Sequence, residues 1–234
     1  MSAQPLPLLP ILEGHGLVKT YGSVVALDRL DFAVYPGEVL AVVGDNGAGK
    51  STLVRCLSAA EFPEAGTMRL DGIEMRFRTA REARTAGINT VYQSLKADEA
   101  MTLSTNLYRD REPSHPGPFG KALLWLESKG VRRSAAASES KVIILDEPTA
   151  SLGAREAVSV RKLIEHLRDR GLPIVFVSHS IPQVYDIADR IHIQQLGRRV
   201  AVVTPRSVST ADLVAIMSGE LQIDEKDQAL GPVR

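Results

Sequence analysis

Residues 39–52 read VLAVVGDNGAGKST, and this stretch decides the fold because an apolar strand runs directly into a glycine-rich loop. Gly44, Gly49, Lys50 and Ser51 have the spacing of a phosphate-binding loop. Glycines let the backbone curl so that several N–H groups face a β-phosphate, and the following helix presents its positive N-terminal end. The lysine then reaches the β- and γ-phosphates, while the serine holds Mg²⁺. The loop therefore predicts binding of a nucleoside triphosphate.

The whole loop is predicted to line this site. Its residues are Gly44, Asp45, Asn46, Gly47, Ala48, Gly49, Lys50, Ser51 and Thr52. The alternative is a glycine-rich turn between a strand and a helix, which would need no ligand.

The composition is that of an ordinary globular protein, with 44% hydrophobic and 24% charged residues among 234. The 28 basic residues balance 28 acidic ones, so no overall field favours nucleic acid or an anionic membrane surface, and nucleic acid is not the implied partner. The single cysteine, Cys56, excludes an internal disulfide and is predicted to pack against the core. No apolar run approaches about 18 residues, so we expect no membrane span.

Apolar runs along the chain predict an α/β fold with a mostly parallel, doubly wound sheet. Residues 11–18, 27–34 and 39–43 read as strands, with Pro36-Gly37 as the turn between the last two, and a small antiparallel layer is expected to open the domain. Residues 142–145 and 174–177 are continuous apolar runs typical of central parallel strands. Residues 155–170 are predicted to form the crossover helix between them. Its expected apolar face consists of Val158, Leu163, Ile164 and Leu167.

Turn signals predict two hairpins, one at Asp71-Gly72 and one at Leu196-Gly197. Residues 88–92 read as a strand that ends at Gln93. Ser209 or Thr210 is predicted to cap a short helix that ends at Met217.

Polar residues follow both central apolar runs. Asp146 ends the first run, where a carboxylate at the carboxyl edge of a parallel strand can hold Mg²⁺. Glu147 comes next and is the candidate general base for in-line attack of water on a γ-phosphate. His179 follows the second run and is a candidate hydrogen-bond donor to that phosphate. Alternatives remain for these side chains, namely a surface acid for Glu147 and a structural role for His179.

The motifs together resemble the ATPase subunit of an ATP-binding cassette transporter. The resemblance rests on Tyr21, GDNGAGKST at 44–52, Gln93, ILDEPTASLG at 144–153 and SHS at 178–180, all in the family's order. It covers residues 11–108 and 141–222. YGSVVALDRLDFAVYPGEVLAVVGDNGAGKSTL, EARTAGINTVYQS and ADRIHIQQLGRR are further similar to single-cassette ATPases of bacterial monosaccharide importers.

This resemblance implies roles for individual side chains. Tyr21 stacks on adenine, which is chemically reasonable because an aromatic face binds any base. Gln93 contacts Mg²⁺ and senses the membrane subunits, Glu147 is the catalytic base, and His179 is the switch histidine. Ser51, Gln93 and Asp146 form the metal set. A loop tyrosine that covers the core edge is the alternative for Tyr21.

The resemblance also implies the cofactors, the partners and the location. ATP and Mg²⁺ are the cofactors. The partners are transmembrane permease subunits, a second cassette in a homodimer and, indirectly, a periplasmic sugar-binding protein. The expected location is peripheral, at the cytoplasmic face of the bacterial inner membrane.

The implied fold is a P-loop NTPase core with an N-terminal antiparallel β layer and a truncated helical subdomain. The single nucleotide-binding domain is predicted at 11–222, with a core of 11–97 and 141–222 and a shortened helical insert at 98–140. Residues 1–10 and 223–234 are expected to be flexible termini.

The sequence departs from the family in its middle. The signature LSGGQ is absent, and Asp146 follows Gln93 by 53 positions, a few tens fewer than the family has. A deletion, a sequence error or a pair of frameshifts would each account for this. The leading interpretation is a sugar-importing ATPase, and the alternative is a cassette that binds nucleotide but hydrolyses it poorly. A small-metabolite kinase is a third interpretation, which the Gln93, DEP and SHS set disfavours.

Overall fold

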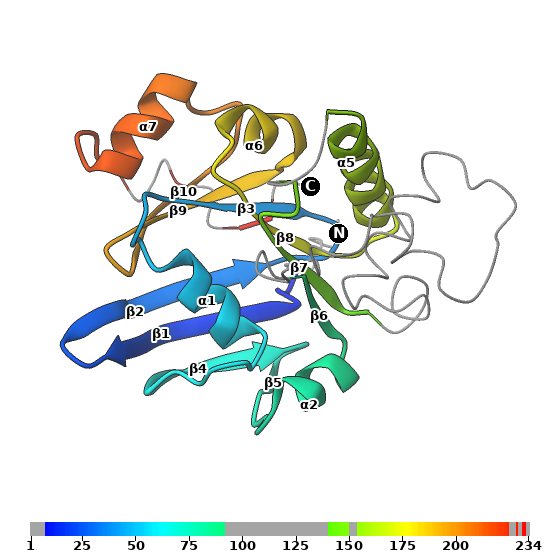
Figure 1. Ribbon diagram of the computed structural model, residues 1–234, viewed down its shortest axis with the longest axis vertical. Helices are drawn as coiled ribbons and strands as arrows, with labels where there is room; N and C mark the ends of the chain where they lie inside the picture. The colour runs from blue at the N-terminus through cyan, green and yellow to red at the C-terminus, as the bar shows by residue number, and fades with distance from the viewer. Residues whose placement is uncertain (1–7, 92–139, 150–153, 225–227, 229–230, 233–234) are drawn as a thin grey trace, which may run out of the picture.

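The computed structural model describes residues 8–91, 140–149, 154–224, 228 and 231–232. Figure 1 shows a mixed α/β arrangement with two sheets. The larger sheet contains β3 (Val39–Val43), β6 (Ile88–Val91), β7 (Val142–Asp146), β8 (Ile174–Val177), β9 (Arg190–Gln195) and β10 (Arg198–Val203). The smaller sheet contains β1 (Leu12–Tyr21), β2 (Val24–Val34), β4 (Ala65–Leu70) and β5 (Ile73–Glu74). The helices are α1 (Lys50–Leu57), α2 (Ala80–Thr85), α5 (Ala154–Asp169), α6 (Ile181–Ile187) and α7 (Thr210–Ser218).

The larger sheet has the order β10-β9-β3-β8-β7-β6 and is parallel except for β10, which pairs with β9 in the antiparallel sense. The smaller sheet has the order β2-β1-β4-β5 and is antiparallel. The predicted fold class, a mostly parallel sheet with an antiparallel layer built from the N-terminal strands, is therefore confirmed for this part of the chain. The predicted strand at 39–43 is β3, which pairs in parallel with β8 and β9 and does not join the antiparallel layer.

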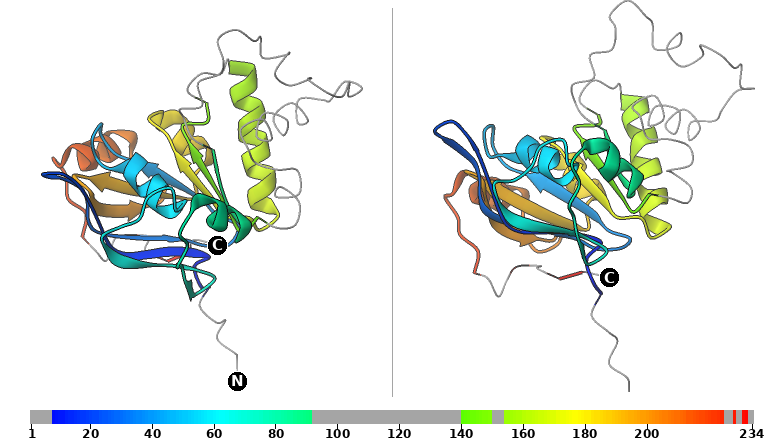
Figure 2. Two further views of the ribbon diagram at one scale, coloured as in Figure 1. Left: turned by 60° about the horizontal axis from the view of Figure 1, so that its bottom comes forward. Right: turned by 90° about the horizontal axis from the view of Figure 1, so that it is seen from below.

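The side chains of β3 alternate between the two faces of the parallel sheet, and both faces are buried. Val39, Ala41 and Val43 point into the core that contains residues of α5, α6 and α7. Leu40 and Val42 point into the other core, against α1 and the antiparallel sheet. Figures 1 and 2 show α5, α6 and α7 on one face of the parallel sheet, and α1 with the antiparallel sheet on the other. A strand buried on both faces has no polar side, which is what its sequence predicts.

Both predicted hairpins are confirmed, and the left-handed backbone at their tips explains the turn residues. Asp71 and Gly72 have φ of 52° and 73°, and Leu196 and Gly197 have φ of 46° and 77°. Two consecutive positive φ values match the twist of the flanking strands. The helix cap is confirmed as well, because the Ser209 hydroxyl accepts a hydrogen bond from the N–H of the third residue of α7.

The predicted apolar face of α5 is wrong at one position. Val158 is 53% exposed, and Val160 is buried in its place, together with Leu163, Ile164 and Leu167. Val160 is three, four and seven residues before the others, so these four share a stripe, whereas Val158 lies about 200° around the helix from Val160. The helices α2 and α6 are not among the predicted elements.

Some predictions fall outside the described residues. They concern Gln93, the helical insert at 98–140 except Ser140, and most of both termini. Gln228, near the C-terminus, is described and accepts a hydrogen bond from the Val202 N–H. Cys56 is buried as predicted, and burial raises the pKa of its thiol to about 11. Among the described helices, none is both long enough and apolar enough to cross a membrane.

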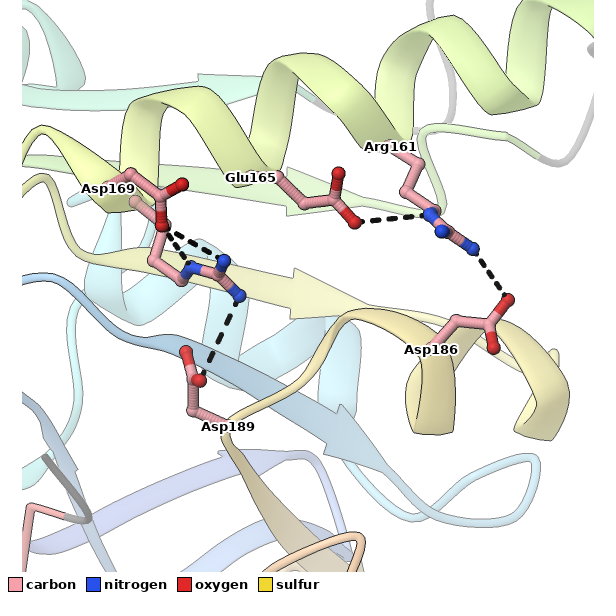
Figure 3. Close-up of polar contacts among 6 residues, drawn as sticks. Arg161, Glu165, Asp169, Asp186 and Asp189 are labelled. Atoms are coloured by element: carbon pink, nitrogen blue, oxygen red, sulfur yellow. Dashed lines mark hydrogen bonds and ion pairs between the residues drawn. The ribbon is translucent and has the colours of Figure 1, made fainter.

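Ion pairs along α5 join this helix to its neighbours (Figure 3). Arg161 contacts Asp186 of α6 at 3.0 Å, and Glu165 on its own helix at 3.1 Å. Arg168 lies 3.9 Å from Asp189, in the segment that enters β9. The Arg161 pairs are largely exposed and contribute at most about 1 kcal/mol each. They orient α5, but the buried stripe stabilises its position.

A histidine is buried between the parallel sheet and the antiparallel layer. His192 on β9 is 1% exposed, and its ring centroid lies 5.8 Å from that of Phe32. Its Nε2 atom has no hydrogen-bond partner among the described residues. Burial lowers the pKa of His192 to about 3, and the positive charges of Arg199 and Arg190 act in the same direction. The side chain is therefore neutral in the folded protein at neutral pH.

This histidine is expected to weaken the fold in acid. Since its pKa is about 3 when folded and about 6.5 when unfolded, the unfolded chain binds the proton first. Stability is complete above about pH 6.5 and falls as the pH drops toward 3. Between pH 7.5 and pH 5, protonation of His192 in the unfolded state should lower the free energy of unfolding of the parent chain by roughly 2 kcal/mol. We expect His192→Leu to lack this decrease. Urea denaturation at both pH values measures it.

The control is His166→Leu, which changes an exposed histidine of α5 and should retain the pH dependence of the parent chain. An identical pH dependence in His192→Leu and the parent chain would contradict the prediction.

Candidate functional site

The loop between β3 and α1 is shaped by glycines that have close neighbours. Gly44, Gly47 and Gly49 have φ of 156°, 82° and 98°, and Gly49 caps α1. A Cβ atom would lie 2.2 Å from the Gln194 carbonyl oxygen at Gly44, and 2.2 Å from the Ala26 carbonyl oxygen at Gly49. At Gly47 a Cβ would meet no atom within 4 Å. The two ends of the loop are thus fixed against neighbouring backbone, while its middle is open.

Lys50 is held across the loop. It is 7% exposed, and its Nζ donates to the carbonyl oxygens of Gly44 at 2.7 Å and Asp45 at 3.0 Å. Burial lowers the pKa of Lys50, whereas the carboxylates of Glu147, Asp45 and Asp146 raise it. Two neutral carbonyls compensate a buried charge only in part, so an anion at the loop would be stabilised by this ammonium.

The polar residues after β7 and β8 meet at one edge of the parallel sheet. Asp146 pairs with Val177 in the register of these strands and is 7% exposed. Burial raises the pKa of Asp146, as does the neighbouring Glu147 carboxylate, whereas Lys50 and His179 lower it. The structure therefore brings together four of the predicted residues: Lys50, Asp146, Glu147 and His179.

Glu147 is held in a strained conformation that faces His179. Its φ is 49°, in the left-handed region that a glutamate rarely adopts, and its N–H donates to the Val177 carbonyl at 3.0 Å. The Glu147 Oε1 atom lies 2.6 Å from His179 Nε2. The Glu147 side chain is 13% exposed, whereas that of His179 is 48% exposed. Such strain is typical of positions where a side chain must point into a site.

The oxygen ligands present suit Mg²⁺. Ser51, at the second position of α1, is exposed, and Thr52 is buried at 8% exposure. A hydroxyl and a carboxylate such as Ser51 and Asp146 are hard donors of the kind that Mg²⁺ prefers beside phosphate oxygens. The loop residues Asp45 and Asn46 are exposed and leave the approach to the loop open.

Two predicted residues are not joined to this group. Tyr21 is 41% exposed, and its hydroxyl donates to Glu61, beyond the C-terminal end of α1. Lys19 lies over its ring, 5.6 Å from the centroid. Tyr21 thus contacts the end of α1 that is remote from the loop, and its adenine-stacking role stays a prediction. Gln93 lies outside the described residues.

One residue that contacts the loop directly is not among the predicted site residues. Gln194 is wholly buried, and its Nε2 donates to the Ala48 carbonyl at 2.9 Å. The Gly197 N–H donates to the same oxygen, also at 2.9 Å. A signal existed in the sequence, because RIHIQQ places two amides at the end of a strand that is otherwise buried. The turn signal at Leu196-Gly197 predicts only a hairpin for that segment.

Comparison with known proteins identifies the family. The family described as ABC transporter matches residues 27–137. The chain is 43% identical to the fructose import ATP-binding protein FrcA of Rhizobium meliloti, over 90% of this chain and 94% of that protein. It is 32% identical to the ribose import ATP-binding protein RbsA 2 of Escherichia coli O157:H7, over 96% of this chain. It spans only about half the length of that second relative.

Solved structures agree on the fold. The dimeric structure of a bacterial ABC transporter cassette superposes with a TM-score of 0.65 at 20% identity, over 83% of this chain and 99% of that one. The match to FrcA covers nearly the whole of both chains, and the loop at 44–52 and the acidic end of β7 agree with it. The chain belongs to the ABC transporter family, as one of its ATP-binding ATPase subunits.

Proposed function

We propose that this chain binds MgATP on the loop 44–52 and hydrolyses it to drive import of a monosaccharide. The observation that carries the proposal is the meeting of Lys50, Asp146, Glu147 and His179 at the carboxyl edge of the parallel sheet. Ligands of α/β proteins bind at this edge, where side chains from successive strands converge.

The loop residues supply the binding energy. Backbone N–H groups of residues 44–52 and the N-terminus of α1 face the phosphates, and Lys50 donates to their oxygens. Gly47 has space on its outer side, so the backbone there can approach a phosphate closely. Tyr21 is proposed to stack on the adenine.

The carboxylates supply the chemistry. Mg²⁺ neutralises phosphate charge when bound, and Ser51, Gln93 and Asp146 are the proposed residues that hold it. Glu147 accepts a proton from the attacking water, which makes that water a better nucleophile. His179 orients Glu147 through the 2.6 Å contact and faces the γ-phosphate. The strained backbone of Glu147 holds its carboxylate in place without reorganisation.

The transport role rests on the relatives. The chain resembles proteins named for fructose and ribose import, and the Rhizobium relative matches it over nearly its whole length. We propose that it works as a peripheral subunit at the cytoplasmic face of the inner membrane, with permease subunits and a second copy of itself. The solved dimeric cassette supports the second copy. A periplasmic sugar-binding protein would take part indirectly, through the permease.

An alternative is a cassette that binds ATP but turns it over poorly. The sequence lacks LSGGQ. The alignment with the fructose import relative runs over 245 positions but uses only 90% of this chain, so the relative carries a few tens of residues without a counterpart here. A shortened insert at 98–140 would account for these residues. Donors that act only in the transition state affect turnover more than binding.

Turnover and binding measured side by side separate the two functions. We expect the purified chain to bind a nonhydrolysable ATP analogue with Mg²⁺ and to release phosphate from ATP at a rate above that of buffer. The fructose import relative serves as the positive control. Binding without turnover would support the alternative, and absence of binding would overturn both. Loss of sugar uptake on deletion of the gene tests the transport role.

A further inference from the structure

Gln194 lies beside the loop because of the register of the parallel sheet. Val43, the last residue of β3, pairs with Ile193 of β9, so Gln194 is opposite Gly44, where the loop begins. The Gln194 carbonyl oxygen would lie 2.2 Å from a Cβ at Gly44. Its side-chain Nε2 would lie 2.7 Å from a Cβ at Gly49, the residue that ends the loop. This one residue therefore contacts both ends of the loop.

Two hydrogen bonds to the Ala48 carbonyl hold the direction of one loop peptide, and Gln194 supplies the one that comes from a side chain. Its Nε2 donates to the Ala48 carbonyl at 2.9 Å, from the side that faces the sheet. In a planar trans peptide the C=O and the following N–H point in opposite directions. A carbonyl of Ala48 held toward the sheet therefore directs the Gly49 N–H toward the open side of the loop, where a phosphate would bind.

The amide is an unusual choice for this position if it serves only the core. Gln194 is 0% exposed, and its Oε1 atom receives no hydrogen bond from any described residue. A buried polar atom without a partner costs roughly 1–3 kcal/mol. The Gly197 N–H already donates to the Ala48 carbonyl, so the carbonyl would not be left alone without Gln194. An apolar residue of equal volume would avoid the cost of the Oε1 atom.

We propose that Gln194 is a positioning residue for nucleotide binding, which holds the Ala48–Gly49 peptide so that the Gly49 N–H donates to a phosphate of the nucleotide. The inference rests on the proposed binding of ATP at the loop. It adds to the binding site a residue on β9 that is far from the loop in the sequence. Gln194 acts through the loop backbone and does not itself touch the nucleotide.

The test is Gln194→Met, which preserves the length of the side chain and removes the donor. We expect the dissociation constants of ADP and of a nonhydrolysable ATP analogue to rise roughly 5- to 30-fold, the effect of one misdirected donor. The free energy of unfolding should stay equal or rise, since the unpartnered Oε1 atom is also removed. Titration calorimetry and urea denaturation measure the two quantities on the same preparations.

The neighbouring glutamine provides the matched control. Gln195 lies on the same strand but points toward Gly219 at the end of α7, where a Cβ would be 2.6 Å from its Nε2. Gln195→Met should leave both dissociation constants unchanged. Gln194→Leu serves as a second apolar replacement if the methionine packs badly.

The outcomes separate this inference from the proposed function. Unchanged affinity in the Gln194 variants, with binding intact in the parent chain, would overturn the positioning role alone. Loss of affinity in step with loss of stability in both variants would also overturn it, because the amide would then be a requirement of the core. A parent chain that binds no nucleotide would overturn the proposed function itself.

Discussion

Replacement of Lys50 by alanine is expected to weaken binding of a nonhydrolysable MgATP analogue by roughly 10- to 100-fold, the range for a hydrogen bond to a charged group. Lys50 is the buried cation nearest the loop, and its Nζ already lies 2.7 Å from the Gly44 carbonyl and 3.0 Å from that of Asp45. The ammonium could donate to a bound phosphate with little further loss of side-chain entropy or hydration, because the Lys50 side chain is ordered and largely desolvated before the ligand binds.

Titration calorimetry of the purified variant checks this expectation, and urea denaturation establishes that the fold survives the loss of the two carbonyl contacts. Lys162→Ala is the matched control, since Lys162 is exposed on α5, far along the chain from the loop. Lys162→Ala should bind the analogue like the parent chain. If Lys50→Ala bound the analogue as tightly as the control, the assignment of residues 44–52 as a phosphate-binding loop would be wrong.

The parts of the fold that could be predicted are those that local rules determine. The run at 39–43 predicted a buried strand because it is continuously apolar, and its residues do enter two separate cores. Asp71-Gly72 predicted a hairpin because few other residue pairs adopt two positive φ values in succession. Such signals depend on a few neighbouring residues and need no knowledge of tertiary contacts.

Other elements depend on signals that were present but short. The helix α2 begins after Thr79, whose hydroxyl accepts from the Glu82 N–H at 3.2 Å, and the Arg78 N–H donates to the Glu82 carboxylate. Thr79 and Glu82 form a capping-box pattern in the sequence, which is the one local signal for the start of this short helix. The helix α6 has seven residues, which is too few for an apolar period to be recognised.

The candidate site was predictable in its chemistry but not in its geometry. The strand ends and the loop spacing brought Lys50, Asp146 and Glu147 to attention, because these types in this order suit phosphate and Mg²⁺. The contact of Tyr21 with Glu61 and the contact of Gln194 with Ala48 both join segments far apart in the chain. Such contacts follow from strand register and packing, which a single sequence does not specify.

Glu147→Gln is expected to reduce ATP turnover by roughly 10²- to 10⁴-fold, the usual contribution of a general base, while binding stays intact. Glutamine has nearly the shape of glutamate and can adopt the same left-handed backbone, so the fold around φ 49° should persist. It accepts no proton from water at neutral pH, so the attack on the γ-phosphate loses its base. The nonhydrolysable analogue should bind as tightly or more tightly, since a negative charge beside Lys50 and Asp146 is removed.

Single-turnover phosphate release and calorimetry on the same preparation measure both halves of this prediction, provided that the parent chain turns over ATP. Glu165→Gln is the control, because it neutralises a carboxylate on α5 whose partner is the exposed Arg161. We expect turnover in the control to equal that of the parent chain. Turnover that persisted in Glu147→Gln would show that another group takes the proton. The 2.6 Å contact with His179 would then orient a carboxylate that holds water or metal, and His179 would become the next side chain to replace.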